Sequence, residues 1–482
     1  MEAINIFLKK EQENNMFDRK IFDINYWEYI RPIVSCECNS IISESSAMFS
    51  KSKFNIKKYM INFSDIKKYF IKKDNCDILF VSQARRVKTD NGYKNNYIDY
   101  YIDYLKKDYK IICLEEPSWS SLGNSEKSHS FPIYTENIFL TDIHELILLI
   151  RIFSYKYLHR KKYLKIIKEY DEVTNIVNGW YKGSHQNIQF KKYFLKSLIR
   201  IDIDKKYIKK ILRKTNPKIV MLHYMPSIFK QMLINECNNQ NIKTIEIQHG
   251  TITKVDPLVN KCLDISKLKN DTKYIFSFGE KQVNKYALSI KEKSNVINIG
   301  FPFFEEKKKQ IGKVKKDNNN YILIISQSTI GDAMAKFASE LSEIINDTKY
   351  KIVFKYHPNE LTKDYECLKR ENIIEIKEEK TIYEIQNESI LQIGSYSTSL
   401  YEGFAMHIPT LIIETMFGSI ETIDIFKDIK NGVYYIKKPR DVLNYIGRND
   451  IIPLDKDIDK LWQTNSKQRL KEAIKKIIKE MK

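Results

Sequence analysis

The sequence predicts an α/β protein built from two Rossmann-like domains. Two series of short apolar segments support this prediction, because most segments are followed by a polar loop and then by a stretch with helical periodicity. A charged segment almost without apolar periodicity, 303–320, separates the two series. We therefore expect an N-terminal domain over 1–302, a linker over 303–320 and a C-terminal domain over 321–482. At 482 residues the chain is also too long for one ordinary core.

The composition is typical of a soluble globular protein, with 43% hydrophobic and 29% charged residues. No stretch approaches the ~18 apolar residues of a membrane-spanning helix, and the first residues lack the apolar core of a signal peptide. The seven cysteines are scattered, and only Cys36 and Cys38 lie close together. We therefore expect reduced thiols, no zinc site and a cytoplasmic protein.

The net charge of +20 comes from 81 Lys and Arg residues against 61 Asp and Glu residues. Nucleic acid, an anionic membrane surface and a phosphorylated substrate would all suit such a charge. The abundance of Lys, Ile, Asn and Tyr also fits an A/T-rich coding bias. Charge alone therefore does not choose among these partners.

The N-terminal series starts with a buried strand at Cys76–Ser82, after residues 1–75, which carry no motif. Arg85 and Arg86 follow this strand, where they can face either the acceptor side of a ligand crevice or solvent. The further elements expected in this domain are helices over 97–107 and from Pro226 to about Asn238, and strands over 109–114, 218–222, 244–247, 274–278 and 296–299. The order strand–helix–strand favours a parallel sheet.

Residues 142–215 interrupt this series with apolar positions at helical spacing and strongly basic polar faces. We expect a basic helical insertion here. A basic amphipathic helix with aromatic side chains can lie on an anionic membrane surface. It can also be a solvated helix that packs on its own domain, and the sequence leaves both interpretations open.

A histidine follows the expected strand 244–247, in the order Gln248, His249, Gly250. The glycine allows the backbone to turn sharply. An imidazole with a pKa near neutrality is suited to take a proton from a sugar hydroxyl. His249 is therefore a candidate base, and a packed histidine is the alternative.

The C-terminal series is the more regular of the two. Its expected strands cover 321–325, 351–356, 373–376, 389–393, 410–413 and 433–436. Its expected helices cover 332–346, 361–371 and 381–386, a stretch starting near Leu400, and 458–482. Ligands of open parallel sheets bind outside the carboxyl ends of the strands, so the loops that follow the strands are the candidate site.

Three polar loops follow strands in this domain. They contain Gln327, Ser328 and Thr329; His357 and Pro358; and Ser395, Ser397, Thr398 and Ser399. Hydroxyl and backbone N–H groups at a helix N-terminus form an anion site, for which phosphate is the usual ligand. Glu402 lies one turn into the following helix, where a carboxylate can accept two ribose hydroxyls. The alternative is an ordinary Ser/Thr helix cap.

Six short segments carry a resemblance to a known family. They are IEIQHGTI, FGE, IGFPFFE, ISQSTIG, KYHPNE and IGSYSTSLYEG, in this order over about 217–415. The set resembles bacterial surface-polysaccharide glycosyltransferases of the GT-B fold, which act on capsule or O-antigen. The wider group includes bacterial sialyltransferases, Kdo transferases and teichoic-acid glycerophosphotransferases. The resemblance implies two Rossmann-like domains facing a cleft and a nucleotide-sugar donor, with a cytidine nucleotide favoured.

The resemblance also implies roles for individual residues. His357 and Pro358, then Ser397 and Thr398, match the HP motif and the Ser/Thr pair that contact the donor's phosphates. In the sialyltransferases a carboxylate precedes a glycine in the first domain, whereas in the glycerophosphotransferases a histidine does. His249 precedes Gly250 here, which disfavours a sialic-acid donor and favours His249 as the base.

We therefore expect an inverting glycosyltransferase that extends capsule or lipopolysaccharide from a nucleotide-sugar donor. Its acceptor would be an oligosaccharide or a lipid-linked glycan, and an anionic membrane surface is a candidate partner at the inner face of the cytoplasmic membrane. No DxD-type segment follows a convincing strand, so we expect neither a metal ion nor a cofactor. The alternatives are a CDP-glycerol-type polyol-phosphate transferase, a nucleotide-sugar 2-epimerase and a basic nucleic-acid-binding protein. The ordered polar loops argue against nucleic acid as a partner.

Overall fold

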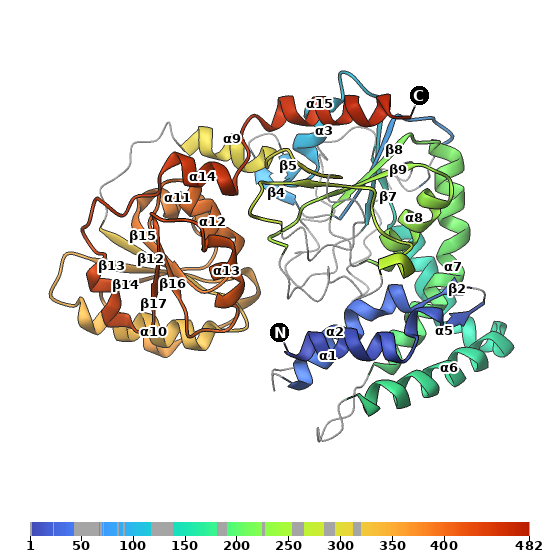
Figure 1. Ribbon diagram of the computed structural model, residues 1–482, viewed down its shortest axis with the longest axis horizontal. Coiled ribbons are helices and arrows are strands. Elements are labelled where there is room, and N and C mark those ends of the chain that lie inside the picture. Colours follow the sequence, from blue (N-terminus) through green and yellow to red (C-terminus); the bar gives the residue numbers. More distant parts are fainter. Residues whose placement is uncertain are drawn as a thin grey trace. The chain divides into compact units, whose positions relative to one another are not determined.

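The computed structural model describes the chain in several stretches, which form two compact units (Figure 1). The described residues are 2–22, 24–42, 67, 70, 72–83, 86–89, 92–116, 138–180, 190–223, 227–252, 265–283, 295–311 and 320–481. The first unit comprises 1–276, 284–297 and 470–482, and the second comprises 277–283 and 298–469. Each unit holds one parallel sheet with helices, so the predicted α/β class with two Rossmann-like domains is confirmed.

The sheet of the first unit has the strand order β11-β10-β9-β8-β3-β6-β7. Its strands are β3 (Ile78–Gln83), β6 (Ile111–Glu116), β7 (Ile138–Leu140), β8 (Ile219–His223), β9 (Lys243–Ile247), β10 (Tyr274–Ser277) and β11 (Val296–Asn298). Neighbouring strands from β10 to β7 pair in parallel. The central strands are apolar and buried, as expected of a sheet with both faces covered. The strand order reverses between β3 and β8, which makes this point the topological switch point of the sheet.

The predicted helical insertion is confirmed. It consists of α5 (Asp142–Leu158), α6 (Arg160–Gly179) and α7 (Lys191–Thr215), which pack against one another in the first unit (Figure 1). Their inner faces contribute Tyr155, Ile166, Val173 and Phe194 to one continuous core with strands β3, β6 and β8. The other described helices of this unit are α1 (Glu2–Glu13), α2 (Trp27–Ile42), α3 (Asp99–Leu105) and α8 (Ile228–Asn239). Its described hairpins pair β1 (Lys20–Ile21) with β2 (Ile24–Asn25) and β4 (Arg86–Thr89) with β5 (Gly92–Asn95).

Two N-terminal helices add a layer that the sequence pattern did not predict. Glu11 on α1 is buried and accepts hydrogen bonds from Trp27 Nε1 at 2.8 Å and from Arg31 Nε at 2.8 Å. Trp27 also packs edge-on against Trp180 at the end of α6, with ring centroids 6.2 Å apart. These contacts join α1 and α2 to the helical insertion.

The sheet of the second unit has the order β14-β13-β12-β15-β16-β17, and all neighbouring strands pair in parallel. Its strands are β12 (Tyr321–Ile325), β13 (Lys351–Lys355), β14 (Ile373–Ile376), β15 (Ser389–Gly394), β16 (Thr410–Ile413) and β17 (Val433–Ile436). The chain runs outward from β12 through β13 to β14 and then crosses back to β15. This is the Rossmann order, with the switch point between β12 and β15.

Helices cover both faces of the second sheet. Figure 1 shows α10 on one face and α11 and α12 on the other. The helices of this unit are α9 (Pro302–Ile311), α10 (Gly331–Ile344), α11 (Ile382–Glu388), α12 (Thr398–Ala405), α13 (Ser419–Phe426) and α14 (Asp455–Leu461). The last helix, α15 (Ser466–Lys479), begins in the second unit, and the chain belongs to the first unit from Leu470 onward.

Three sequence-based expectations differ from the structure. The expected linker 303–320 is helical at its start, because Phe303 and Phe304 of α9 are buried against Tyr383. The expected helix 361–371 contains only the 3-10 turn Glu366–Leu368. Tyr365 leaves the helical path to stack on Tyr356, with ring centroids 5.7 Å apart.

The expected long helix over 458–482 is the third difference, because the structure has the two helices α14 and α15 instead. Trp462 lies at the break and donates from Nε1 to the carbonyl of Tyr401 at 2.9 Å, so packing overrides helical periodicity there. None of the described helices is long and apolar enough to cross a lipid bilayer.

Candidate functional site

The loops that follow β12, β13 and β15 lie at the carboxyl edge of the second sheet. Since β12 and β15 are neighbours at the switch point, the loop beginning at Ser326 and the loop beginning at Ser395 lie on either side of it. His357 and Pro358 follow β13, the next strand on the other side of β12. The predicted donor-side residues therefore share one edge of one sheet.

A buried carboxylate connects two of these loops. Glu360 is 1% exposed and accepts hydrogen bonds from Ser326 Oγ at 3.1 Å, the backbone N–H of His357 at 2.9 Å and Tyr365 Oη at 2.8 Å. A Cβ atom on Gly331 would lie 1.9 Å from Glu360 Oε1, so only glycine fits there without a shift of the carboxylate. Glu360 therefore fixes the β13 loop against the start of α10.

Tyr396 joins the third loop to the first. Its hydroxyl is hydrogen-bonded to Thr329 Oγ1, and its ring packs on Gly418, whose φ is +82°. Ser395 Oγ donates to the carbonyl of Phe417 at 2.8 Å and so connects the β15 loop to the β16 loop. Gln327 is half-buried, and Ser328 and Thr329 are exposed at the same edge.

Helix α12 begins directly after the β15 loop. Ser397 is its N-cap, and its side chain accepts a hydrogen bond from the backbone N–H of Ser399 at 3.2 Å. Ser397, Thr398 and Ser399 are partly exposed, while Leu400 and Tyr401 are buried. Both the predicted phosphate site and the ordinary helix cap require this arrangement, so the cap itself does not separate them.

Glu402 lies one turn into α12 and is buried. It accepts a hydrogen bond from Tyr383 Oη at 3.0 Å. Burial raises the pKa of Glu402 to about 7, and the hydrogen bond from Tyr383 opposes this rise. His357 is half-buried, and burial lowers its pKa below the ordinary value although Glu360 acts in the opposite direction. Burial thus favours the neutral form of the His357 imidazole, which donates one ring hydrogen bond.

Two histidines and a tyrosine meet at the carboxyl edge of the first sheet. The ring of Tyr97 stacks on His223 with centroids 4.9 Å apart and planes 11° apart, and it lies 4.9 Å from the ring of His249. Tyr97 Oη also donates to the carbonyl of His249 at 3.2 Å. His223 ends β8, next to the switch point, and the sequence pattern carries no signal for its role.

Neighbouring polar residues hold this cluster in place. Asn95 donates from Nδ2 to Ser82 Oγ at 2.9 Å, and its Oδ1 accepts from the backbone N–H of Tyr97 at 3.0 Å. Gln248 is buried and donates from Nε2 to the carbonyl of Gly250 at 2.8 Å, which closes the turn around His249. The end of β3 and the turn after β9 are thus tied to the same group of rings.

The predicted arginine pair is described only in part. Arg85 lies outside the described residues. Arg86 starts strand β4, and its backbone pairs with Asn95 of β5, so it belongs to a hairpin and not to an irregular loop. A role of either arginine toward an acceptor stays a prediction.

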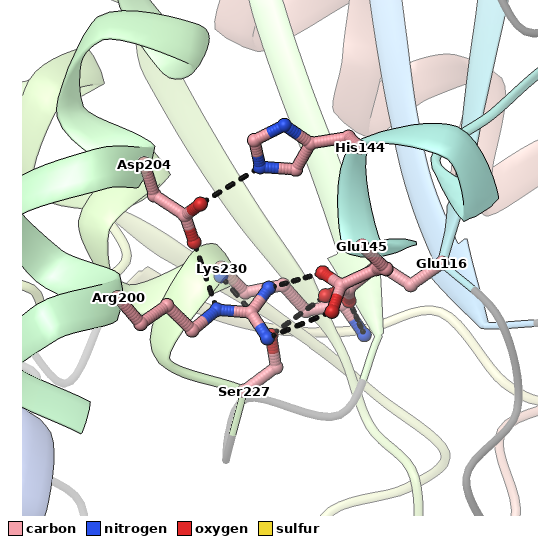
Figure 2. Close-up of polar contacts among 7 residues, drawn as sticks. All are labelled: Glu116, His144, Glu145, Arg200, Asp204, Ser227 and Lys230. Carbon is pink, nitrogen blue, oxygen red and sulfur yellow. Dashed lines mark hydrogen bonds and ion pairs between the residues drawn. The ribbon is translucent and has the colours of Figure 1, made fainter. Parts of the chain in front are cut away.

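A buried charge network also lies at this edge of the first unit. Figure 2 shows Arg200 of α7 between the carboxylates of Glu145 and Asp204. Arg200 Nε lies 2.8 Å from Asp204 Oδ2, and His144 Nε2 lies 2.8 Å from Asp204 Oδ1. The side chains of Asp204 and Glu145 are 0% and 4% exposed.

The network extends to the end of strand β6. Ser227, the N-cap of α8, donates from Oγ to Glu116 Oε1 at 2.9 Å. Lys230 is fully buried and places Nζ 3.4 Å from Glu116 Oε2 (Figure 2). The same Nζ donates to the carbonyl of His223 at 2.9 Å. The network thus holds the backbone of His223, whose ring belongs to the histidine cluster.

The pKa values of the network reflect its mixed charges. Burial raises the pKa of Glu145, and the Arg200 guanidinium opposes that rise without cancelling it. Burial also acts on Asp204, but Arg200 and the hydrogen bond from His144 outweigh it and hold the pKa of Asp204 below its ordinary value. The sequence offered no signal for this network, apart from the position of Glu116 just after the predicted strand 109–114.

The structure therefore groups the predicted residues into two sets. The second unit holds the donor-side set, and the first holds Gln248, His249 and Gly250 together with the unpredicted Tyr97 and His223. The cleft between the two units, which the resemblance implies, stays a prediction.

Comparison with solved structures supports the fold. A putative UDP-N-acetylglucosamine 2-epimerase from Listeria monocytogenes matches with a TM-score of 0.51 at 13% identity, over 84% of this chain and 97% of that one. UDP-GlcNAc 2-epimerase from Methanocaldococcus jannaschii, in complex with UDP-GlcNAc and UDP, matches with a TM-score of 0.48 at 10% identity, over 83% and 99%. The wall teichoic acid polymerase TagF matches with a TM-score of 0.44 at 10% identity, over 94% and 97%.

The sequence matches no family profile and no curated protein. The structural similarity therefore establishes the fold alone: the chain has a GT-B-like fold with two Rossmann-like units.

Proposed function

We propose that this chain is a nucleotide-sugar-dependent glycosyltransferase that acts with inversion on a growing surface glycan. The observation that carries the proposal is the arrangement of the second unit, where the loops after β12, β13 and β15 are hydrogen-bonded together at a Rossmann switch point. Nucleotides bind at such points in open α/β sheets. The putative UDP-N-acetylglucosamine 2-epimerase from Listeria monocytogenes shares this fold, which is consistent with a nucleotide-sugar ligand.

On the donor side, the N-terminus of α12 would hold the donor's phosphates. Ser397 and Thr398 provide hydroxyls, and the first turn provides backbone N–H groups and the positive end of the helix dipole. His357 would donate its ring N–H to the departing phosphate, where negative charge develops in the transition state. Glu402 would accept the ribose hydroxyls, in exchange for its hydrogen bond from Tyr383.

On the acceptor side, His249 would take the proton from an acceptor hydroxyl. The acceptor oxygen forms a bond to the anomeric carbon while the bond from that carbon to the phosphate oxygen breaks, so the nucleotide leaves with the bonding electrons. Tyr97 holds the backbone and ring of His249 and so limits the positions that the imidazole can take. The donor nucleotide would be a cytidine nucleotide and the acceptor an oligosaccharide or lipid-linked glycan of capsule or lipopolysaccharide.

A thermal-shift screen with CMP, CDP, UDP, GDP and dTDP tests the donor site, because a ligand of the folded state raises Tm. We expect a cytidine nucleotide to raise Tm of the wild type and to have a much smaller effect on Ser397→Ala. Thr381→Ala is the matched control, since Thr381 is the N-cap of α11 and its loss costs a similar ~1 kcal/mol of stability. No shift with any nucleotide, or equal shifts in both variants, would contradict the proposal.

A polyol-phosphate transferase is the second candidate, favoured by the order His249–Gly250. In that reaction the acceptor oxygen attacks phosphorus, CMP leaves and a phosphodiester forms. Product analysis separates the candidates, because a glycosyltransferase forms a glycosidic bond instead. A 2-epimerase would need no acceptor, so turnover that depends on an acceptor glycan excludes it.

A further inference from the structure

The outer face of helix α5 is apolar and exposed. Among the described residues, six of the fourteen large apolar side chains that are exposed lie between Ile147 and Leu164. They are Ile147 (42% exposed), Ile150 (61%), Phe153 (70%), Tyr157 (73%) and Leu158 (71%) on α5, and Leu164 (55%) on α6. In the part of the chain that the structure describes, nothing covers them. Such concentration is unusual, since exposed apolar residues on monomers are normally scattered.

The spacing of these residues makes one continuous stripe. At about 100° per residue, the five α5 side chains occupy about 140° of the helix circumference. Leu148 and Tyr155 lie on the opposite side of α5 and are buried in the core of the first unit. Helix α5 is therefore apolar on both faces, and only the inner face has a packing partner among the described residues.

Basic side chains border this stripe. Arg151 and Lys156 flank it on α5, and both are exposed. On α6, exposed basic side chains surround Leu164: Arg160, Lys161, Lys165 and Lys168. The sequence from Leu146 to Lys168 contains no Asp or Glu. The face thus combines a broad apolar stripe with a positively charged border.

The geometry points to an anionic membrane surface as the partner of this face. Lying in a bilayer interface, a helix buries its apolar side among the acyl chains while its Lys and Arg side chains contact anionic headgroups. A second copy of the chain fits less well, because two such faces would bring their positive borders together. This inference does not depend on the proposed catalytic activity.

Vesicle flotation of the full-length chain tests the inference. We expect the wild type to float with vesicles of phosphatidylcholine mixed with phosphatidylglycerol, and to float poorly with phosphatidylcholine alone or at raised salt. The variant Phe153→Ser with Tyr157→Ser should lower the partition coefficient by at least about tenfold. The variant Arg160→Gln with Lys161→Gln and Lys165→Gln should also lower it. Ile344→Ser is the control, because Ile344 is 39% exposed on α10 of the second unit.

Three results would overturn the inference. The first is that the wild type does not float, or floats equally well with neutral vesicles. The second is that Phe153→Ser with Tyr157→Ser lowers the mass measured by sedimentation equilibrium and leaves flotation unchanged, which would assign the face to a second copy. The third is that this variant lowers Tm by several degrees, which would show that the face packs against the chain itself.

Nucleotide thermal shifts measured on the same variants keep the two proposals apart. We expect the nucleotide-induced rise in Tm to be unchanged in the α5 and α6 variants. If the wild type fails to float but binds nucleotide normally, only the proposal of a membrane-binding face is overturned.

Discussion

The hydroxyl of Tyr97 donates to the backbone carbonyl of His249 at 3.2 Å while its ring lies 4.9 Å from the His249 imidazole. One side chain therefore fixes both the backbone and the ring of the proposed base. It also stacks on His223, so the three rings form one unit at the carboxyl edge of the first sheet. A change at Tyr97 should reach the chemistry through the position of His249.

The first prediction concerns this hydroxyl. Tyr97→Phe keeps the stacked ring but removes the hydrogen bond to His249, and we expect kcat to fall about tenfold with little change in the donor KM, because positioning contributes to the transition state. Steady-state kinetics measure the effect, with a nucleotide-sugar donor that carries the nucleotide identified by thermal shift. Tyr29→Phe is the matched control, since Tyr29 accepts from Asn235 at 2.8 Å in the same unit but away from the edge. A Tyr97→Phe enzyme with unchanged kcat would show that the hydroxyl has no positioning role.

The second prediction concerns the carboxylate that joins the donor loops. Glu360→Gln replaces one acceptor oxygen by a donor, so at least one of the hydrogen bonds from Ser326, Tyr365 or the His357 backbone is lost. We expect unfolding in urea to become easier by about 1–3 kcal/mol and nucleotide binding to weaken. Glu366→Gln, at an exposed carboxylate of the same unit, should change neither. Equal nucleotide affinity in Glu360→Gln would mean that the loops need no such connection.

The third prediction concerns pH and Glu402. Its pKa is raised to about 7 by burial, so the folded state holds a proton that the unfolded chain loses near pH 4.5. A raised carboxyl pKa contributes stability that is fully present below about pH 4.5 and is lost as pH rises through about 7. The loss is on the order of 3 kcal/mol.

Urea unfolding at several pH values from 4.5 to 7.5 measures this contribution. Glu402→Gln should flatten the curve of stability against pH in this window, whereas Glu371→Gln, at an exposed position, should leave it unchanged. A curve of unchanged slope in Glu402→Gln would show that Glu402 is not protonated in the folded protein.

The fourth prediction concerns the buried charge network. Arg200→Met leaves the carboxylates of Glu145 and Asp204 without their shared guanidinium, and we expect the free energy of unfolding to fall by about 3–5 kcal/mol. Arg370→Met is the control, because Arg370 pairs with Glu343 on the surface, where ion pairs contribute at most about 1 kcal/mol. A loss no larger than that of the control would show that the network is not required for stability.

Much of the fold could be predicted because buried parallel strands are short apolar runs that end in polar loops. The strands at 321–325, 373–376, 410–413 and 433–436 have the predicted bounds for this reason. The helical insertion was predictable from its long regular periodicity. Helix α9 was not predictable, because its many charged residues give no clear apolar periodicity. Only the fold shows that its two phenylalanines pack against Tyr383.

The parts that escaped prediction depend on contacts between residues far apart in the chain. His223 looked like the end of a strand, and only the fold brings Tyr97 onto its ring. Arg200 and Glu145 are 55 residues apart in sequence, and each looks like one of many charged residues on a helix. Donor-side residues, by contrast, could be placed on one edge because parallel strands carry their loops there.

The central claim is that His249 is the base of a sugar transfer from a nucleotide donor held by the second unit. The most direct measurement is the turnover of His249→Ala with its donor and acceptor, alongside its nucleotide-induced rise in Tm and with His407→Asn as the control histidine. We predict a fall in kcat of at least about 100-fold with an unchanged thermal shift, because a general base contributes about 10²–10⁴ to the rate. Near-normal turnover in His249→Ala would contradict it.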